Sequence, residues 1–61
     1  MHPLLPIIQR HLRLTGVTPT RFGRDAVGDP RLVHDIRNGR QPRPATAARV
    51  LAFIAAREMA P

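Results

Sequence analysis

Apolar residues recur at helical spacing in four segments of the chain, and glycine and proline residues separate these segments. The first segment has one apolar stripe and is followed by Gly16, which is a common helix stop. The stripe consists of Leu4, Leu5, Ile8 and Leu12. Prolines are tolerated in a first helical turn, so Pro3 and Pro6 fit the start of this helix. The pattern predicts a helix over about residues 3–14.

The second segment opens with Thr18 and Pro19, a residue pair typical of a helix N-cap and first helical position. The segment predicts a helix over about residues 18–27. Few residues form the core-facing side of this helix, and one of them is a glycine, which leaves room for a second helix to approach closely. The residues on this side are Phe22, Gly23 and Ala26.

A third helix is predicted over residues 30–38, because Asp29 suits the N-cap, Pro30 the first position and Gly39 the stop. Its inner stripe consists of Leu32, Val33 and Ile36. The opposite face has no apolar residue and consists of Arg31, His34, Asp35 and Asn38. This helix therefore exposes a wholly polar surface.

A fourth helix is predicted over about residues 45–59, with a core face of Val50, Leu51 and Ile54. Phe53 widens the apolar arc, and we expect it at the edge of the core rather than in a contact between two chains. No segment alternates apolar and polar residues as a strand does. The sequence predicts one all-α domain over residues 1–61, a compact four-helix bundle.

A chain of 61 residues can bury only one small core. For sufficient stability, a chain this short usually needs disulfides, a bound metal, unusually tight helix packing or a partner subunit. Cysteine is absent, and His2, His11 and His34 lack the spacing of a zinc site. We expect His2 and His11 to be ordinary residues of the helix surface. Tight packing or a homodimer therefore remains as the source of stability. The fourth helix is our first candidate for a dimer surface, and the first helix is the second. We see neither a secretory signal nor a long apolar run, and we expect a cytoplasmic protein without a membrane contact.

The formal net charge is +6, from ten basic and four acidic residues, and every basic residue is arginine. Six of the ten arginines lie between positions 21 and 43, which favours a polyanionic partner. An arginine excess that merely reflects a GC-rich coding sequence is the open alternative. Serine and cysteine are absent, and no phosphate-binding loop is present, so we expect neither an enzyme nor a cofactor.

Residues 18–38 resemble the helix-turn-helix of the phage lambda repressor and Cro family, also called Xre-type regulators. The similarity covers about two thirds of the chain, from Thr18 to the fourth helix, and the first helix fits less specifically. The matching positions are Phe22, Gly23, Ala26, Val33 and Ile36, and the run Asn38-Gly39-Arg40-Gln41-Pro42. Two features depart from the family: the order Val27 then Gly28 in the turn, and Asp29-Pro30 at the opening of the recognition helix.

The resemblance implies a lambda repressor-like fold and a small bacterial or phage transcription regulator that binds double-stranded DNA as a dimer. The helix at 30–38 would enter the major groove. Candidate base-reading residues are Arg31, His34, Asp35 and Asn38. Candidate phosphate contacts are Thr18, Thr20, Arg21, Arg24, Arg37, Arg40 and Arg43.

Asp35 has two interpretations: it accepts from cytosine, or it pairs with Arg31 one turn earlier, which we favour. Two alternative functions also remain. One is a protein-interaction adaptor whose arginines bind an acidic protein, such as a component of the transcription machinery. The other is RNA binding, which the scarcity of aromatic residues disfavours.

Overall fold

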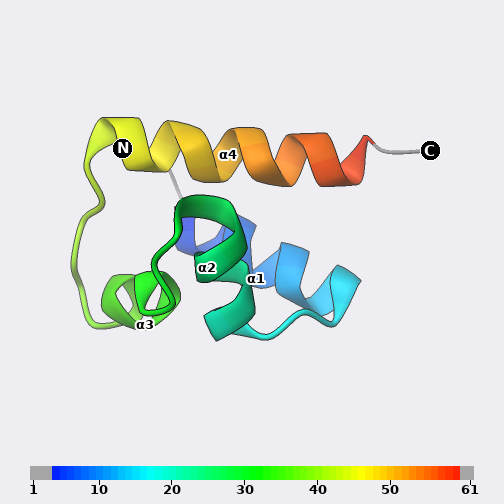
Figure 1. The fold of residues 1–61 in the computed structure, drawn as a ribbon. Helices are drawn as coiled ribbons and strands as arrows, with labels where there is room; N and C mark the ends of the chain where they lie inside the picture. The colour runs from blue at the N-terminus through cyan, green and yellow to red at the C-terminus, as the bar shows by residue number, and fades with distance from the viewer. Residues whose placement is uncertain (1–3, 60–61) are drawn as a thin grey trace.

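The computed structural model describes residues 4–59 and folds them into four helices. They are α1 (Leu4–Thr15), α2 (Pro19–Val27), α3 (Leu32–Arg37) and α4 (Pro44–Glu58). Figure 1 shows α4 lying across α1 and α2, with the short α3 at one end. No strand occurs within residues 4–59, which confirms the all-α prediction. His2 and the expected helix start at Pro3 lie outside the described residues.

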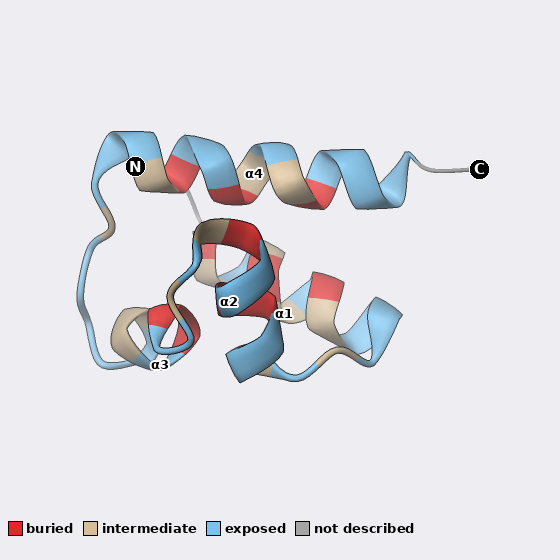
Figure 2. Cartoon of the chain, viewed as in Figure 1, coloured by how far each residue is buried: buried red, intermediate tan, exposed pale blue. Residues whose placement is uncertain are grey.

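The core is built from the apolar stripes that the sequence predicts, one from each helix, except that Leu5 is half-buried and lies outside the core cluster. Figure 2 shows the buried positions turned toward the centre of the bundle. Its buried apolar side chains are Leu4, Ile8, Phe22, Ala26, Leu32, Val33, Ala47, Val50 and Ile54. Ile36, Leu51 and Leu12 are half-buried against this cluster. Each helix therefore has one apolar side and one exposed side.

The ring of Phe22 lies between two other rings in the core. The His11 ring centroid is 5.5 Å away, and the Phe53 ring meets it edge-on at 5.6 Å. The guanidinium of Arg57 lies over the Phe53 ring, 4.6 Å from the ring centroid. Phe53 is half-buried, which confirms its expected place at the core edge.

The expectation that His11 is an ordinary surface residue is wrong. His11 is only 2% exposed, and its Nδ1 lies 3.1 Å from Oε2 of Glu58 at the end of α4. Arg10 adds a second contact, with its Nη1 3.6 Å from Oε1 of the same carboxylate. Glu58 is 47 positions further along the chain. Local spacing in the sequence therefore could not predict this contact. The contact joins the last turn of α4 to α1.

The turn from α2 to α3 depends on Gly28, which has the left-handed φ of 73° that favours glycine. Its N–H donates to the carbonyl of Arg24, and the N–H of Asp29 donates to the carbonyl of Gly23. Both bonds satisfy carbonyls at the end of α2, and the bond from Gly28 to Arg24 is that of the αL capping motif. The chain therefore reverses sharply after Val27 and returns over α2.

The reversal brings the backbone of the turn directly onto Gly23. A Cβ atom at this position would overlap the carbonyl oxygen of Asp29 and would lie 3.1 Å from Cβ of Leu32. Gly23 is buried within α2 and has an ordinary helical conformation. A glycine is therefore required here because the turn lies too close to α2 for a Cβ atom, and the sequence predicts such a close approach.

The third helix is shorter than predicted, because it begins at Leu32 rather than at Pro30. The carboxylate of Asp29 accepts from the N–H of Arg31 at 2.9 Å, and the Asp29 carbonyl accepts from Leu32. These bonds form a tight turn over Pro30 and Arg31 that precedes the helix. Asp29 thus caps a turn, and the expected first helical turn is not α-helical.

Gly23→Ala is expected to destabilise the fold. Alanine in place of a helical glycine ordinarily stabilises by roughly 0.5–1 kcal/mol. At this site the new methyl group meets a backbone carbonyl that cannot turn aside, and we expect a loss of about 1–3 kcal/mol. Urea unfolding followed by circular dichroism measures the sign. A gain in stability would show that the turn does not rest on Gly23.

His11→Ala is expected to lower the free energy of unfolding by roughly 2 kcal/mol, because it opens a cavity beside Phe22 and removes the partner of Glu58. His34→Ala is the matched control, since His34 is exposed on α3 and its loss should cost less than about 0.5 kcal/mol. Thermal unfolding of both variants gives the comparison. Equal losses would contradict the structural role of His11.

Candidate functional site

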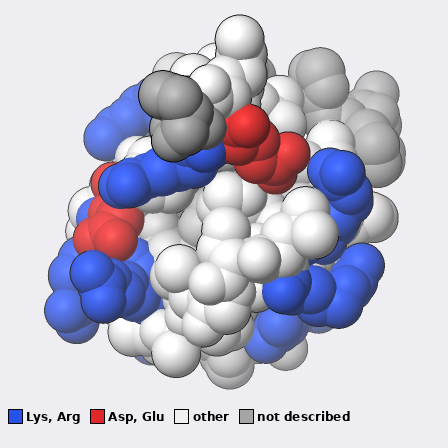
Figure 3. All heavy atoms as spheres, turned by 90° about the vertical axis from the view of Figure 1, so that its right-hand side faces the viewer, with Lys and Arg blue, Asp and Glu red and all other residues white. Residues whose placement is uncertain are grey.

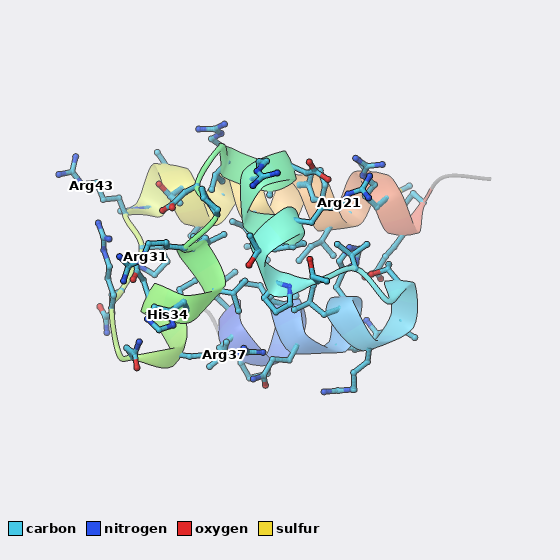
Figure 4. All side chains as sticks on the ribbon, turned by 60° about the horizontal axis from the view of Figure 1, so that its bottom comes forward. Arg21, Arg31, His34, Arg37 and Arg43 are labelled. Carbon is cyan, nitrogen blue, oxygen red and sulfur yellow. The ribbon has the colours of Figure 1, made fainter. Side chains whose placement is uncertain are left out.

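The outward side of α3 and the adjoining turns carry the polar residues that the sequence singles out. Arg31, His34 and Asn38 are exposed, and Arg37 is exposed at the last helical position. Figure 4 shows Arg31 and His34 at the same end of the molecule, with Arg37 nearby. The buried Leu32 and Val33 anchor the other side of the helix in the core. These polar side chains therefore project from a fixed support.

Asp35 is less exposed than its neighbours and lies between two arginines. Its Oδ2 accepts from Nη1 of Arg40 at 3.0 Å, and its Oδ1 lies 4.0 Å from Nη2 of Arg31. The Asp35 side chain is 23% exposed, whereas both arginines are 72% exposed. The expected pair with Arg31 is present at the limit of an ion pair. The closer partner is Arg40.

Arg40 reaches Asp35 because of the way in which α3 ends. Gly39 has a φ of 93°, its N–H donates to the carbonyl of Ile36, and the N–H of Arg40 donates to that of Asp35. These two bonds make a Schellman motif, which turns the chain back along α3. Arg40 is consequently bound to Asp35 by both its backbone and its side chain.

His34 and Asn38 form a hydrogen-bonded pair beside this ionic cluster. Nδ2 of Asn38 lies 3.0 Å from Nε2 of His34, one helical turn apart. Asn38 also closes the helix, since its backbone N–H donates to the carbonyl of His34 at 3.1 Å. The two exposed side chains are thereby fixed relative to each other.

The candidate phosphate contacts come from three elements. Thr18 accepts from the N–H of Arg21 at 3.2 Å and so serves as the N-cap of α2, as predicted. Arg21 is exposed and lies 3.5 Å from Asp25 on the next turn. The remaining candidates are also exposed: Thr20 and Arg24 on α2, Arg37 on α3, and Arg40 and Arg43 on the loop before α4.

The structure brings part of this set together and leaves part of it apart. Arg31, His34 and Arg43 lie at one end of the molecule in Figure 4, whereas Arg21 lies toward the other end. Figure 3 shows the end at which α1 and α4 finish, where arginines and some acidic residues border an uncharged centre. Two large apolar residues are strongly exposed among those described: Leu14 in the last turn of α1, and Met59 directly after α4. The candidate residues therefore do not form one patch, because Arg31, His34 and Arg43 lie together while Arg21 lies apart from them.

Two hollows adjoin α3 and the loop that follows it. The smaller, of about 310 Å³, lies between α3 and the start of α4 and includes Asp35, Arg40, Arg43 and Thr46. The larger, of about 670 Å³, is an open and mainly apolar groove. Leu5, Ile36 and Leu51 line it, with Arg40 as its charged residue. The loop from Gly39 to Pro44 thus separates the polar side of α3 from an apolar surface.

Sequence reasoning missed the contacts that join these residues. The His34–Asn38 and Arg21–Asp25 pairs each have i,i+4 spacing, which was a usable signal. The Arg40–Asp35 contact spans five positions and depends on the left-handed Gly39. No regular helical spacing indicates that contact.

Comparison with known proteins gave no match to a family model, a curated sequence or a solved structure. Within residues 4–59, no cluster of three or more His, Asp or Glu side chains is arranged to hold a metal ion. No helix in the same part of the chain has both the length and the apolar character needed to cross a membrane. The proposals below therefore depend on the geometry of α2, α3 and the loop after them.

Proposed function

We propose that the chain is a small sequence-specific DNA-binding protein of the helix-turn-helix type, with a role in transcription regulation. In this proposal α3 enters the major groove, and α2 crosses the sugar-phosphate backbone. The observation that carries it is the outward side of α3 and its adjoining turns, which is polar, exposed except at the half-buried Asp35, and supported by the buried Leu32 and Val33. A major groove about 12 Å wide admits one such helix.

The charges near α3 support a polyanionic partner. Arg31 and Arg37 belong to the helix and its N-terminal turn, while Arg40 and Arg43 lie on the following loop. Arginine binds phosphate oxygens and also the O6 and N7 atoms of guanine. We assign guanine reading to Arg31, and phosphate contacts to Arg24, Arg37, Arg40 and Arg43. Thr18, Thr20 and Arg21 would meet phosphate at the start of α2.

The length of α3 supports a dimer on DNA. Six residues span roughly 9 Å, which matches only two or three base pairs. Two copies reading half-sites about one helical turn apart would give a useful site length. Phe53 is occupied by Phe22 and Arg57 within one chain, which makes it a poor anchor for a second copy. The apolar groove at α1 and α4 is the better candidate surface.

Selection from a random duplex pool tests the proposal. We expect the wild-type chain to enrich one motif, and Arg31→Ala to lower the preference for that motif over random DNA. Arg43→Ala should weaken both alike and reduce the salt slope by about one. Arg13→Ala on α1 is the matched control. A pool with no enriched motif would contradict sequence-specific binding.

Asp35→Asn is expected to strengthen binding to a random duplex several-fold while it lowers the preference for the selected motif. The change removes a negative charge that faces phosphate and releases Arg31 and Arg40. Stability should change by less than about 1 kcal/mol, because the arginines are largely exposed. Asp25→Asn is the control, since it makes the same charge change on α2. Equal gains in the two variants would reduce the effect to net charge.

A further inference from the structure

The hydrogen bond between His34 and Asn38 carries information about which base α3 reads. Since an amide nitrogen can only donate, Nδ2 of Asn38 is the donor, and Nε2 of His34 accepts in the tautomer that carries its proton on Nδ1. A carboxamide has two N–H donors and one carbonyl acceptor. His34 uses one of the two donors. The other N–H and the carbonyl oxygen Oδ1 therefore remain available on the exposed side of Asn38.

One donor beside one acceptor is the pattern that matches adenine in the major groove. Adenine presents the N7 acceptor next to the N6 amino donor, and asparagine binds this edge through two hydrogen bonds. Guanine presents two acceptors, O6 and N7, and would need two donors from the same side chain. An Asn38 side chain held by His34 is therefore suited to adenine and unsuited to guanine.

Both side chains are oriented before any ligand arrives. Asn38 is fixed at its backbone by the bond to the His34 carbonyl and at its side chain by the bond to the His34 ring. Asp35 turns toward Arg40 and does not compete for Asn38. Orientation in the free protein lowers the entropy lost when the complex forms.

We propose that Asn38 reads the adenine of an A·T pair and that His34 is a positioning residue that sets the orientation of the Asn38 amide. This inference rests on the proposed DNA-binding function and adds to it the identity of one base pair. Asp35, which the sequence also suggested as a base-reading residue, acts here only through the two arginines that it holds.

Selection of duplex motifs by variants tests this assignment position by position. The wild-type motif should contain an adenine at one position of each half-site, preferred over guanine by between about 5-fold and about 150-fold. Asn38→Ala should lose the preference at that position and keep the rest of the motif. His34→Ala should weaken it at the same position, and His34→Gln, whose amide oxygen also accepts, should restore it.

Gln41→Ala is the matched control, because it removes an exposed amide from the neighbouring loop and should leave the motif unchanged. The positioning role of His34 would be overturned if His34→Ala altered stability or affinity without altering base preference. Guanine at the position that depends on Asn38, or no such position, would overturn adenine reading while DNA binding stands. A chain that enriches no motif would overturn the proposed function as well.

Discussion

The close contact between Gly23 and the turn before α3 is the constraint on which the rest of the fold depends. Since a Cβ at position 23 would overlap the Asp29 carbonyl, the backbone of the turn lies as near to α2 as packing allows. This contact sets where α3 begins and which of its sides faces Phe22. The polar side of α3 is exposed as a consequence, because Leu32 and Val33 on its opposite side are already buried.

Two glycine-terminated helices give the site its geometry. Gly28 returns the chain over α2 through an αL cap, and Gly39 returns it along α3 through a Schellman motif. The first reversal sets the position of α3, and the second brings Arg40 to Asp35. The backbone therefore determines the ionic cluster as much as side-chain charge does.

Much of the fold was predictable, because the apolar stripes have helical period and glycine, proline and capping residues mark the boundaries. Gly23 was predictable as a packing position because it lies beside Phe22 and Ala26 on one side of a short helix. The start of α3 was not predictable, because an Asp29 carboxylate can cap either a helix or a tight turn. In the structure it caps the turn over Pro30 and Arg31. His11 was missed because its partner, Glu58, comes from the far end of the chain.

The candidate site was predictable as a set of residues and not as a set of contacts. Helical spacing gave the polar face of α3, whereas the contact of Asp35 with Arg40 depends on the chain path after the helix. If α3 enters the major groove as proposed, Asp35 brings a negative charge to the phosphates of every sequence that the chain visits. Such a charge shortens the residence time on each nonspecific site. The protein would therefore scan a genome faster, with a lower maximal affinity for DNA.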